Sequence, residues 1–145
     1  MTQDPFAVLF VCTGNICRSP FAEHYARSVW PETMSVASAG TAAVVGSGAT
    51  DLMCSVAEDV GLDLTSHVAR QLTHTDSPDL VLTMEPRHTT VARRIFPDVP
   101  RHRIRLLGAT PIADPYGRGV DAYRTAVAEI MLAVDELGYG SGTRT

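Results

Sequence analysis

The sequence predicts an α/β fold, a three-layer sandwich in which a four-stranded parallel sheet carries helices on both faces. Short apolar runs alternate with segments of helical character along the chain, and this alternation implies right-handed β-α-β crossovers. The run over residues 6–11 is almost continuously apolar, which is typical of a parallel strand buried on both faces. A length of 145 residues with 45% hydrophobic content suits one domain, residues 1–145, with a core of its own.

The first strand is expected over residues 6–11 and is followed by a helix over residues 19–30. Ser19 suits the N-cap of this helix and Pro20 suits its first position, because proline lacks the N–H that would be unpaired there. Pro31 ends the helix, since the residue before a proline disfavours helical geometry.

A second, half-buried strand is predicted over residues 34–39, and a loop of small and glycine residues leads from it to Thr50. Thr50 or Asp51 caps a second helix that reaches about residue 60, where Gly61 suits the position after its end. A polar connection then fills residues 62–78.

The third strand is expected over residues 79–84, and a third helix over residues 85–96 stops at Pro97. A short fourth strand over residues 103–107 precedes a loop rich in proline and glycine. The fourth helix follows, and residues 138–145 are predicted to be a flexible tail. The apolar face of that helix comprises Val120, Tyr123, Val127, Ile130, Met131, Val134 and Leu137.

Composition excludes several classes of protein. A net charge of −4 argues against a general nucleic-acid binder, and no apolar run is long enough to cross a membrane. Three cysteines do not suit a disulfide framework, and the first residues lack the features of a signal peptide. The expectation is a cytoplasmic protein, with a monomer as the default state.

The segment from Cys12 to Pro20 predicts an anion site. Gly14 and Asn15 suit a turn whose successive backbone N–H groups point inward at an oxyanion. The helix that follows directs its positive end at the same point, and Arg18 adds a fork that grips two phosphate oxygens. Cys12 then lies at the mouth of a phosphate cradle that favours its thiolate, the form in which cysteine is a nucleophile.

Asp114 is the best candidate for a general acid. The loop that carries it follows the fourth strand, so it opens at the same edge of the sheet as the loop after Cys12. Pro115 and Tyr116 stiffen the backbone beside the carboxylate and add an aromatic ring. Asp121 would lie inside the last helix, and the remaining alternatives, Asp98 and Asp76, lie outside a loop at this edge.

The segment from Cys12 to Pro20, together with Asp114, Pro115 and Tyr116, resembles the low-molecular-weight protein tyrosine phosphatase family. The likeness spans nearly the whole chain and extends to residues 38–41 and 66–72. It implies that Cys12 is the nucleophile, Arg18 the phosphate clamp and Asp114 the general acid and base, without a metal or cofactor. The other residues to which it assigns a role are Thr13, Gly14, Asn15, Ile16 and Cys17 as the phosphate-binding loop, Ser19 as a partner of the Cys12 sulfur, Ser38 and His67 as supports of Asn15, and Tyr116 as a wall of the cleft.

Ile16 and the later loops refine the expected substrate. In this family a bulky isoleucine at this position goes with phosphotyrosine, whereas the similar arginine phosphatases carry threonine. Arsenate reductases of this fold need two later cysteines, and no cysteine follows Cys54. The aliphatic residues 42–45 and Gly117 after Tyr116 resemble the bacterial enzymes that act on tyrosine autokinases of exopolysaccharide export. A phosphoarginine phosphatase and a phosphate-binding module without turnover remain the alternatives.

Several residues keep more than one interpretation. Cys17 either packs the loop or, as the family resemblance implies, forms a reversible disulfide with Cys12. Cys54 is expected in the core. The arginines at positions 93, 94, 101, 103 and 105 form either a solvated face or a docking surface for an acidic partner. His24, His74, His88 and His102 show no spacing typical of metal ligands and are expected at the surface.

Overall fold

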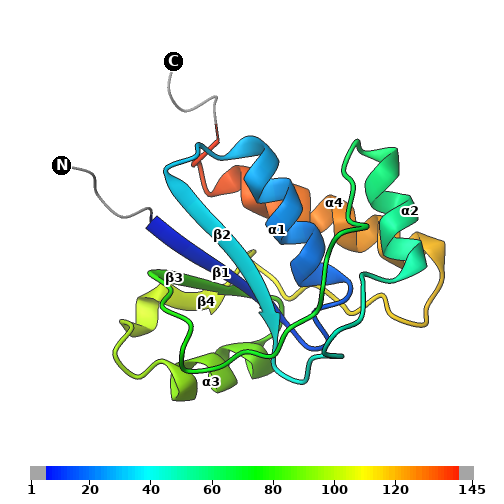
Figure 1. Ribbon diagram of the computed structural model, residues 1–145. Helices are drawn as coiled ribbons and strands as arrows, with labels where there is room; N and C mark the ends of the chain where they lie inside the picture. Colours follow the sequence, from blue (N-terminus) through cyan, green and yellow to red (C-terminus); the bar gives the residue numbers. More distant parts are fainter. Residues whose placement is uncertain (1–5, 141–145) are drawn as a thin grey trace.

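A parallel sheet of four strands in the order β2-β1-β3-β4 lies at the centre of the computed structural model, which describes residues 6–140. The helices lie in layers on its two faces (Figure 1), so the predicted three-layer α/β sandwich is confirmed. The elements are β1 (Phe6–Cys12), α1 (Arg18–Val29), β2 (Met34–Gly40), α2 (Asp51–Asp59), β3 (Leu80–Thr83), α3 (Pro86–Ile95), the 3-10 turn η1 (Arg101–Arg103), β4 (Ile104–Leu106) and α4 (Val120–Glu136).

Strand β1 is buried on both faces, as its continuous apolar run predicts. Val8 and Phe10 belong to the larger apolar cluster, which joins the sheet to α1, α2 and α4. Leu9 and Val11 belong to a smaller cluster that joins the opposite face to α3. Because successive side chains of a strand point to opposite faces, this one strand connects the two halves of the core.

Most element boundaries differ by one residue from those expected, and local contacts explain two of these differences. Helix α1 begins at Arg18, so Ser19 lies within its first turn instead of capping it. The Ser19 hydroxyl contacts Cys12 and Asn15, and these partners replace the helix amide that a cap would bind. Strand β4 begins at Ile104, because Arg101–Arg103 form the turn η1.

The end of α4 is tied to the fold by an aromatic contact. The ring of Tyr139 lies edge-on to Trp30, with centroids 5.2 Å apart. The first residues of the predicted tail therefore pack on the domain, while residues 141–145 lie outside the described residues. Within residues 6–140, no helix has the length and apolar character needed to cross a membrane.

The carboxyl ends of β1 and β4 open at the same edge of the sheet, because all strand pairs are parallel. Cys12 is the last residue of β1, and the loop between β4 and α4 carries Asp114. In such sheets ligands bind beyond the carboxyl ends of the strands. The topology therefore brings together two residues that are 102 positions apart in the chain.

Candidate active site

The phosphate loop runs from Cys12, the last residue of β1, to Arg18, the first residue of α1. Asn15 has a φ of 57°, the left-handed conformation that asparagine tolerates better than most residues. Gly40 of β2 lies directly behind this loop, and a Cβ atom there would come within 2.4 Å of the Thr13 carbonyl oxygen. A glycine is therefore required where the two backbones approach.

The side chain and carbonyl of Asn15 hold the loop in this conformation. Its Nδ2 donates to Ser19 at 2.8 Å and to Ser38 at 3.0 Å, and its Oδ1 accepts the Arg70 N–H at 2.9 Å. Nε2 of His67 lies 2.7 Å from its carbonyl oxygen. Burial lowers the pKa of His67, so the ring is neutral and donates through Nε2. The contacts thus match the supporting roles predicted for Ser38 and His67.

Ser19 connects the Asn15 side chain to the sulfur of Cys12. Its Oγ accepts from Asn15 and lies 2.9 Å from the Cys12 Sγ. Since the oxygen already accepts one hydrogen bond, its own O–H is free to donate to the sulfur.

Arg18 is 1% exposed and its guanidinium is held by protein oxygens. One terminal nitrogen donates to Glu85 Oε2 at 2.5 Å and to the Ile112 carbonyl at 2.7 Å. Its Nε is buried and has no hydrogen-bond partner in the part of the chain that the structure describes. A buried N–H without a partner is costly, so this side of the fork is available to an oxyanion.

Glu85 was not predicted from the sequence. It follows β3 at the N-cap of α3, beside the end of β1. Burial alone would raise its pKa, but the hydrogen bond and positive charge of Arg18 outweigh burial and lower the pKa. One signal for this residue was available in the sequence. A carboxylate follows the strand that pairs with β1.

Asp114 lies on the loop before α4, with its side chain 44% exposed. One carboxylate oxygen accepts the Tyr116 N–H at 3.1 Å, and the other lies 3.7 Å from a terminal nitrogen of Arg18. The turn across Pro115 thus fixes the carboxylate at the mouth of the phosphate loop. The carboxylate therefore lies beside Arg18 in the same cleft as Cys12.

Cys12, Arg18 and Asp114 line one cleft of about 420 Å³. Ile16 and Val44 form one apolar wall, and the exposed ring of Tyr116 is the one aromatic lining residue among those described. The lining residues are Cys12, Thr13, Gly14, Ile16, Cys17, Arg18, Ala42, Val44, Ser47, Gly48, Thr50, Asp114 and Tyr116.

His88 anchors the first residue of the phosphate loop to α3, and the prediction that it lies at the surface is wrong, because it is 1% exposed. Its Nδ1 accepts the Glu85 N–H at 3.1 Å, which leaves Nε2 to donate to the Thr13 hydroxyl at 2.8 Å. Burial and, next, the charge of Arg18 lower its pKa to about 4, so the ring is neutral at pH 7. Arg87 also donates to the Thr13 hydroxyl, at 3.1 Å.

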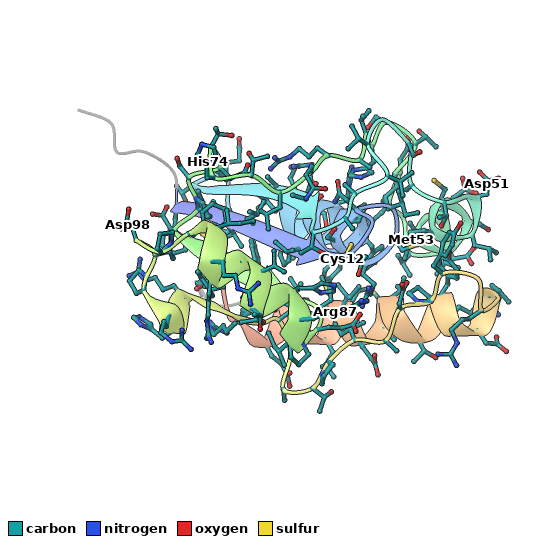
Figure 2. The ribbon with its side chains drawn as sticks, turned by 90° about the horizontal axis from the view of Figure 1, so that it is seen from below. Cys12, Asp51, Met53, His74, Arg87 and Asp98 are labelled. Atoms are coloured by element: carbon teal, nitrogen blue, oxygen red, sulfur yellow. The ribbon has the colours of Figure 1, made fainter. Side chains whose placement is uncertain are left out.

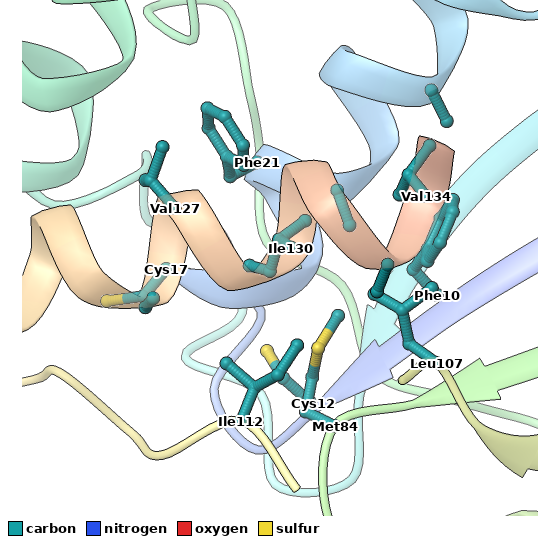
Figure 3. Packing of buried hydrophobic residues seen from close by; sticks show 14 of the residues in the cluster. Phe10, Cys12, Cys17, Phe21, Met84, Leu107, Ile112, Val127, Ile130 and Val134 are labelled. Carbon is teal, nitrogen blue, oxygen red and sulfur yellow. The ribbon is translucent and has the colours of Figure 1, made fainter. Parts of the chain in front are cut away.

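Cys17 lies on the opposite side of the loop from this anchor. Its sulfur is 3.4 Å from the Tyr123 hydroxyl and 3.6 Å from the Thr50 hydroxyl. Burial raises the pKa of the Cys17 thiol, and that of Tyr123 is raised to about 12, again chiefly by burial. Cys12 and Cys17 both belong to the large apolar cluster (Figure 3) and are free thiols.

The chain matches the family described as low molecular weight phosphotyrosine protein phosphatase over residues 7–139. The chain belongs to this family. It is 41% identical over 122 residues to the low molecular weight protein-tyrosine-phosphatase Wzb of Salmonella typhi, with 80% of each chain covered. It is 37% identical over 136 residues to the low molecular weight protein-tyrosine-phosphatase Etp of Escherichia coli, with 90% of each covered. The resemblance inferred from the sequence, to the bacterial members of the family, is confirmed.

Solved structures give the same result. The tyrosine phosphatase AmsI of Erwinia amylovora superposes with a TM-score of 0.85 at 38% identity, and 94% of each chain is covered. The YwlE arginine phosphatase of Geobacillus stearothermophilus superposes with a TM-score of 0.82 at 32% identity, over 92% of this chain and 90% of that one. The protein is a phosphatase of this family, and a binding module without turnover is not favoured.

Proposed function

We propose that this protein hydrolyses phosphotyrosine in a protein substrate through a phospho-cysteine intermediate, without a metal. The observation that supports this function is the convergence of Cys12, Arg18 and Asp114 in one cleft, with the Nε of Arg18 available to an anion. A thiolate, a phosphate clamp and a proton donor are the three groups that the reaction requires.

In the first step the Cys12 thiolate attacks phosphorus and the bond to the phenolic oxygen breaks. The backbone amides from Thr13 to Cys17 and the guanidinium of Arg18 bind the phosphoryl oxygens as charge shifts between them. Asp114 gives its proton to the departing phenolate, so the tyrosine side chain leaves as a neutral phenol.

In the second step Asp114, now a carboxylate, takes a proton from a water molecule as the water attacks phosphorus. The S–P bond breaks, phosphate leaves and Asp114 is protonated again. The hydroxyl of Ser19, 2.9 Å from the sulfur, stabilises the thiolate that is expelled. Each group therefore returns to its starting state.

The cleft favours an aryl phosphate over an alkyl guanidinium phosphate. Ile16 and Val44 offer an apolar wall, and the ring of Tyr116 stands at the mouth beside Asp114. A flat aromatic ring buries its surface against such walls, whereas the donors of a guanidinium need acceptors. The arginine phosphatase remains the second candidate because YwlE shares the fold.

We place the protein in the cytoplasm as a monomer, with a phosphotyrosine protein such as a bacterial tyrosine autokinase as its partner. The three free cysteines, one of them the nucleophile, suit a reducing compartment. The similarity to Wzb supports a phosphotyrosine protein as the substrate class.

Cys17 is proposed to protect the nucleophile under oxidation. A peroxide converts the Cys12 thiolate to a sulfenic acid, and the Cys17 sulfur then attacks it, forming an S–S bond as water leaves. Both residues line the same cleft within one short loop.

Turnover of p-nitrophenyl phosphate tests the proposed function. Cys12→Ser and Arg18→Ala are expected to abolish turnover, and Asp114→Ala to lower kcat by roughly 100- to 1,000-fold, since general acid catalysis contributes on that order. Normal turnover by Cys12→Ser would exclude the phospho-cysteine route. Comparison of phosphotyrosine and phosphoarginine peptides in the wild type and in Ile16→Thr distinguishes the two substrates, because only the threonine variant is expected to gain activity on phosphoarginine.

A further inference from the structure

Two exposed arginines, Arg94 on α3 and Arg101 in η1, lie on elements that Arg93 joins, and they are together called the arginine surface here. The segment of residues 86–105 carries six arginines and one aspartate, a net charge of +5, in a chain whose net charge is −4. The remainder of the chain therefore carries −9. The positive charge is concentrated in about one seventh of the sequence.

The arginine surface is not neutralised within the molecule. Neither of its two guanidinium groups forms an ion pair within residues 6–140, whereas Arg18, Arg27, Arg70, Arg87 and Arg124 each have a carboxylate partner there. Arg103 lies over the Phe6 ring at 5.9 Å and Arg105 is in register with Leu82, so both lie on the face of the sheet opposite to α3 and are not part of this surface.

The half-buried Arg93 holds the elements of this surface together. It donates to the carbonyl oxygens of Arg101 and Ile104 at 3.0 and 2.8 Å, so α3, η1 and β4 are fixed against one another. Like charges on one face repel each other and oppose folding. A rigid frame that keeps them together gives a binding surface prepared for an anion.

The arginine surface continues towards the catalytic cleft along α3. Arg87 donates to the Thr13 hydroxyl in the phosphate loop, and Arg94 lies seven residues further along the same helix. Seven residues are two helical turns, so both side chains lie on one face about 10 Å apart along the axis. Figure 2 shows Arg87 at the end of α3 near Cys12 and Asp98 beyond the other end.

We propose that the arginine surface binds an acidic segment of the substrate protein, on the same polypeptide as the phosphotyrosine that enters the cleft. This inference rests on the proposed function. Arginine pairs with carboxylates through two parallel hydrogen bonds. An extended chain advances about 3.3 Å per residue, so acidic residues roughly four to seven positions from the phosphotyrosine reach Arg94 and its neighbours. Binding of the acidic segment favours phosphoproteins that carry one and leaves the catalytic steps in the cleft unchanged.

An acidic polypeptide fits this surface better than a lipid or a nucleic acid does. Surfaces that bind membranes insert apolar side chains, and none of the large exposed apolar residues of the described chain lies within residues 86–105. A long polyanion would also meet the remaining chain, whose net charge is −9. A short acidic segment avoids this repulsion.

Steady-state kinetics on three phosphotyrosine peptides test the proposal. One peptide carries three glutamates at positions four to six after the phosphotyrosine, the second carries them before it, and the third carries glutamines instead. Arg94→Gln and the double variant Arg94→Gln/Arg101→Gln are compared with Arg124→Gln, a matched exposed helical arginine on α4. Binding to the same peptides is also measured with Cys12→Ser, and p-nitrophenyl phosphate reports the cleft alone.

One glutamate peptide is expected to have a lower KM than the glutamine peptide at 0.05 M salt. This advantage falls by about 3-fold in Arg94→Gln and about 10-fold in the double variant, with kcat unchanged, and it disappears at 0.5 M salt. Equal KM values for all peptides, or an equal loss in Arg124→Gln, would overturn the proposal. So would equal KM values together with arginine-dependent binding to phosphatidylglycerol vesicles, which would assign the surface to a membrane. A lack of p-nitrophenyl phosphate turnover would refute the proposed function, while peptide binding by Cys12→Ser still reports on the docking surface.

Discussion

The side chain of Arg18 shows how single residues prepare the site. A buried guanidinium is costly to desolvate, and Glu85 with the Ile112 carbonyl offsets that cost. These two oxygens hold one end of the fork and leave Nε for the substrate. The carboxylate therefore positions the cation without occupying its phosphate-binding side.

Replacing Glu85 is expected to weaken both catalysis and stability. Glu85→Gln removes the charge that holds Arg18, so kcat for p-nitrophenyl phosphate falls by roughly 10-fold and unfolding free energy by about 1 to 3 kcal/mol. Urea denaturation and steady-state kinetics measure the two effects. Glu58→Gln, an exposed position on α2, is the control and changes neither quantity. Unchanged kcat in Glu85→Gln would show that the carboxylate does not position Arg18.

Cys17 gives a second prediction at the scale of the residue. Wild-type protein inactivated by hydrogen peroxide is expected to regain most of its activity with dithiothreitol, because the Cys12–Cys17 disulfide is reducible. Cys17→Ser lacks the resolving sulfur and regains less, as measured by p-nitrophenyl phosphate turnover after reduction. Cys54→Ser serves as the control, and equal recovery in all three proteins would contradict the redox role.

Sequence reasoning found the site residues that lie within local motifs and missed those that act across the fold. Cys12, Arg18 and Asp114 stand out because a turn, a helix start and a proline surround them. Glu85 and His88 have ordinary neighbours, and their contacts with Arg18 and Thr13 exist only after β1 and β3 pair. Such partners require the three-dimensional fold.

At the scale of the element, α3 does more than cover one face of the sheet. A capping box joins Glu85 and His88 at its N-terminus, and the same His88 ring binds Thr13. The start of this helix and the start of the phosphate loop are thereby fixed to each other. The sequence predicted a helix that stops at Pro97 but not this link, because His88 was expected at the surface.

The neutral ring of His88 makes stability depend on pH. Its pKa is about 4 in the folded protein and near 6.5 when unfolded, so the unfolded state binds more protons between these values. This contribution to stability is fully present above pH 6.5 and is lost as the pH falls towards 4. Urea denaturation is expected to show a loss of roughly 1 to 3 kcal/mol between pH 7 and 5.

His88→Gln keeps a donor and an acceptor without a titrating group, so it is expected to reduce this loss. The exposed His74→Gln is the matched control and keeps the wild-type dependence. His67, whose pKa is also lowered, leaves a residual slope of the same sign. Glu85 does not affect the slope between pH 7 and 5, because its pKa is lowered and its contribution to stability is lost only below about pH 4.5. A wild-type slope in His88→Gln would contradict the assignment.

At the scale of the whole molecule, most apolar side chains lie on one face of the sheet, under α1, α2 and α4. Trp30 closes this cluster at the end of α1, stacked on Phe10 with ring centroids 5.8 Å apart. Tyr139 then covers Trp30 from the end of the chain. The first strand, the first helix and the last described residues thus share one aromatic contact.

Tyr139→Ala is expected to lower the unfolding free energy by about 1 to 3 kcal/mol, since it removes a half-buried ring and its aromatic partner. Thermal or urea denaturation measures the change. Tyr116→Ala, which removes a ring that is 61% exposed, is expected to have little effect on stability. Equal stability of the two variants would show that the end of the chain adds nothing to the core.

The order of strands and helices could be predicted from hydrophobic periodicity, which depends on which residues are buried. A flexible tail was expected from residue 138 onwards, because glycine and serine are frequent in the last eight residues of the chain. One aromatic residue in that stretch finds a partner more than a hundred positions earlier. Composition alone does not report a contact of that kind.

The distribution of the catalytic groups along the chain has a consequence for biosynthesis. Cys12 leaves the ribosome before Ile112 and Asp114, which emerge about a hundred residues later. Until then Arg18 lacks the Ile112 carbonyl as a partner and the thiolate lacks a proton donor. A nascent chain is therefore inactive until the loop with Ile112 and Asp114 has emerged and folded against the phosphate loop.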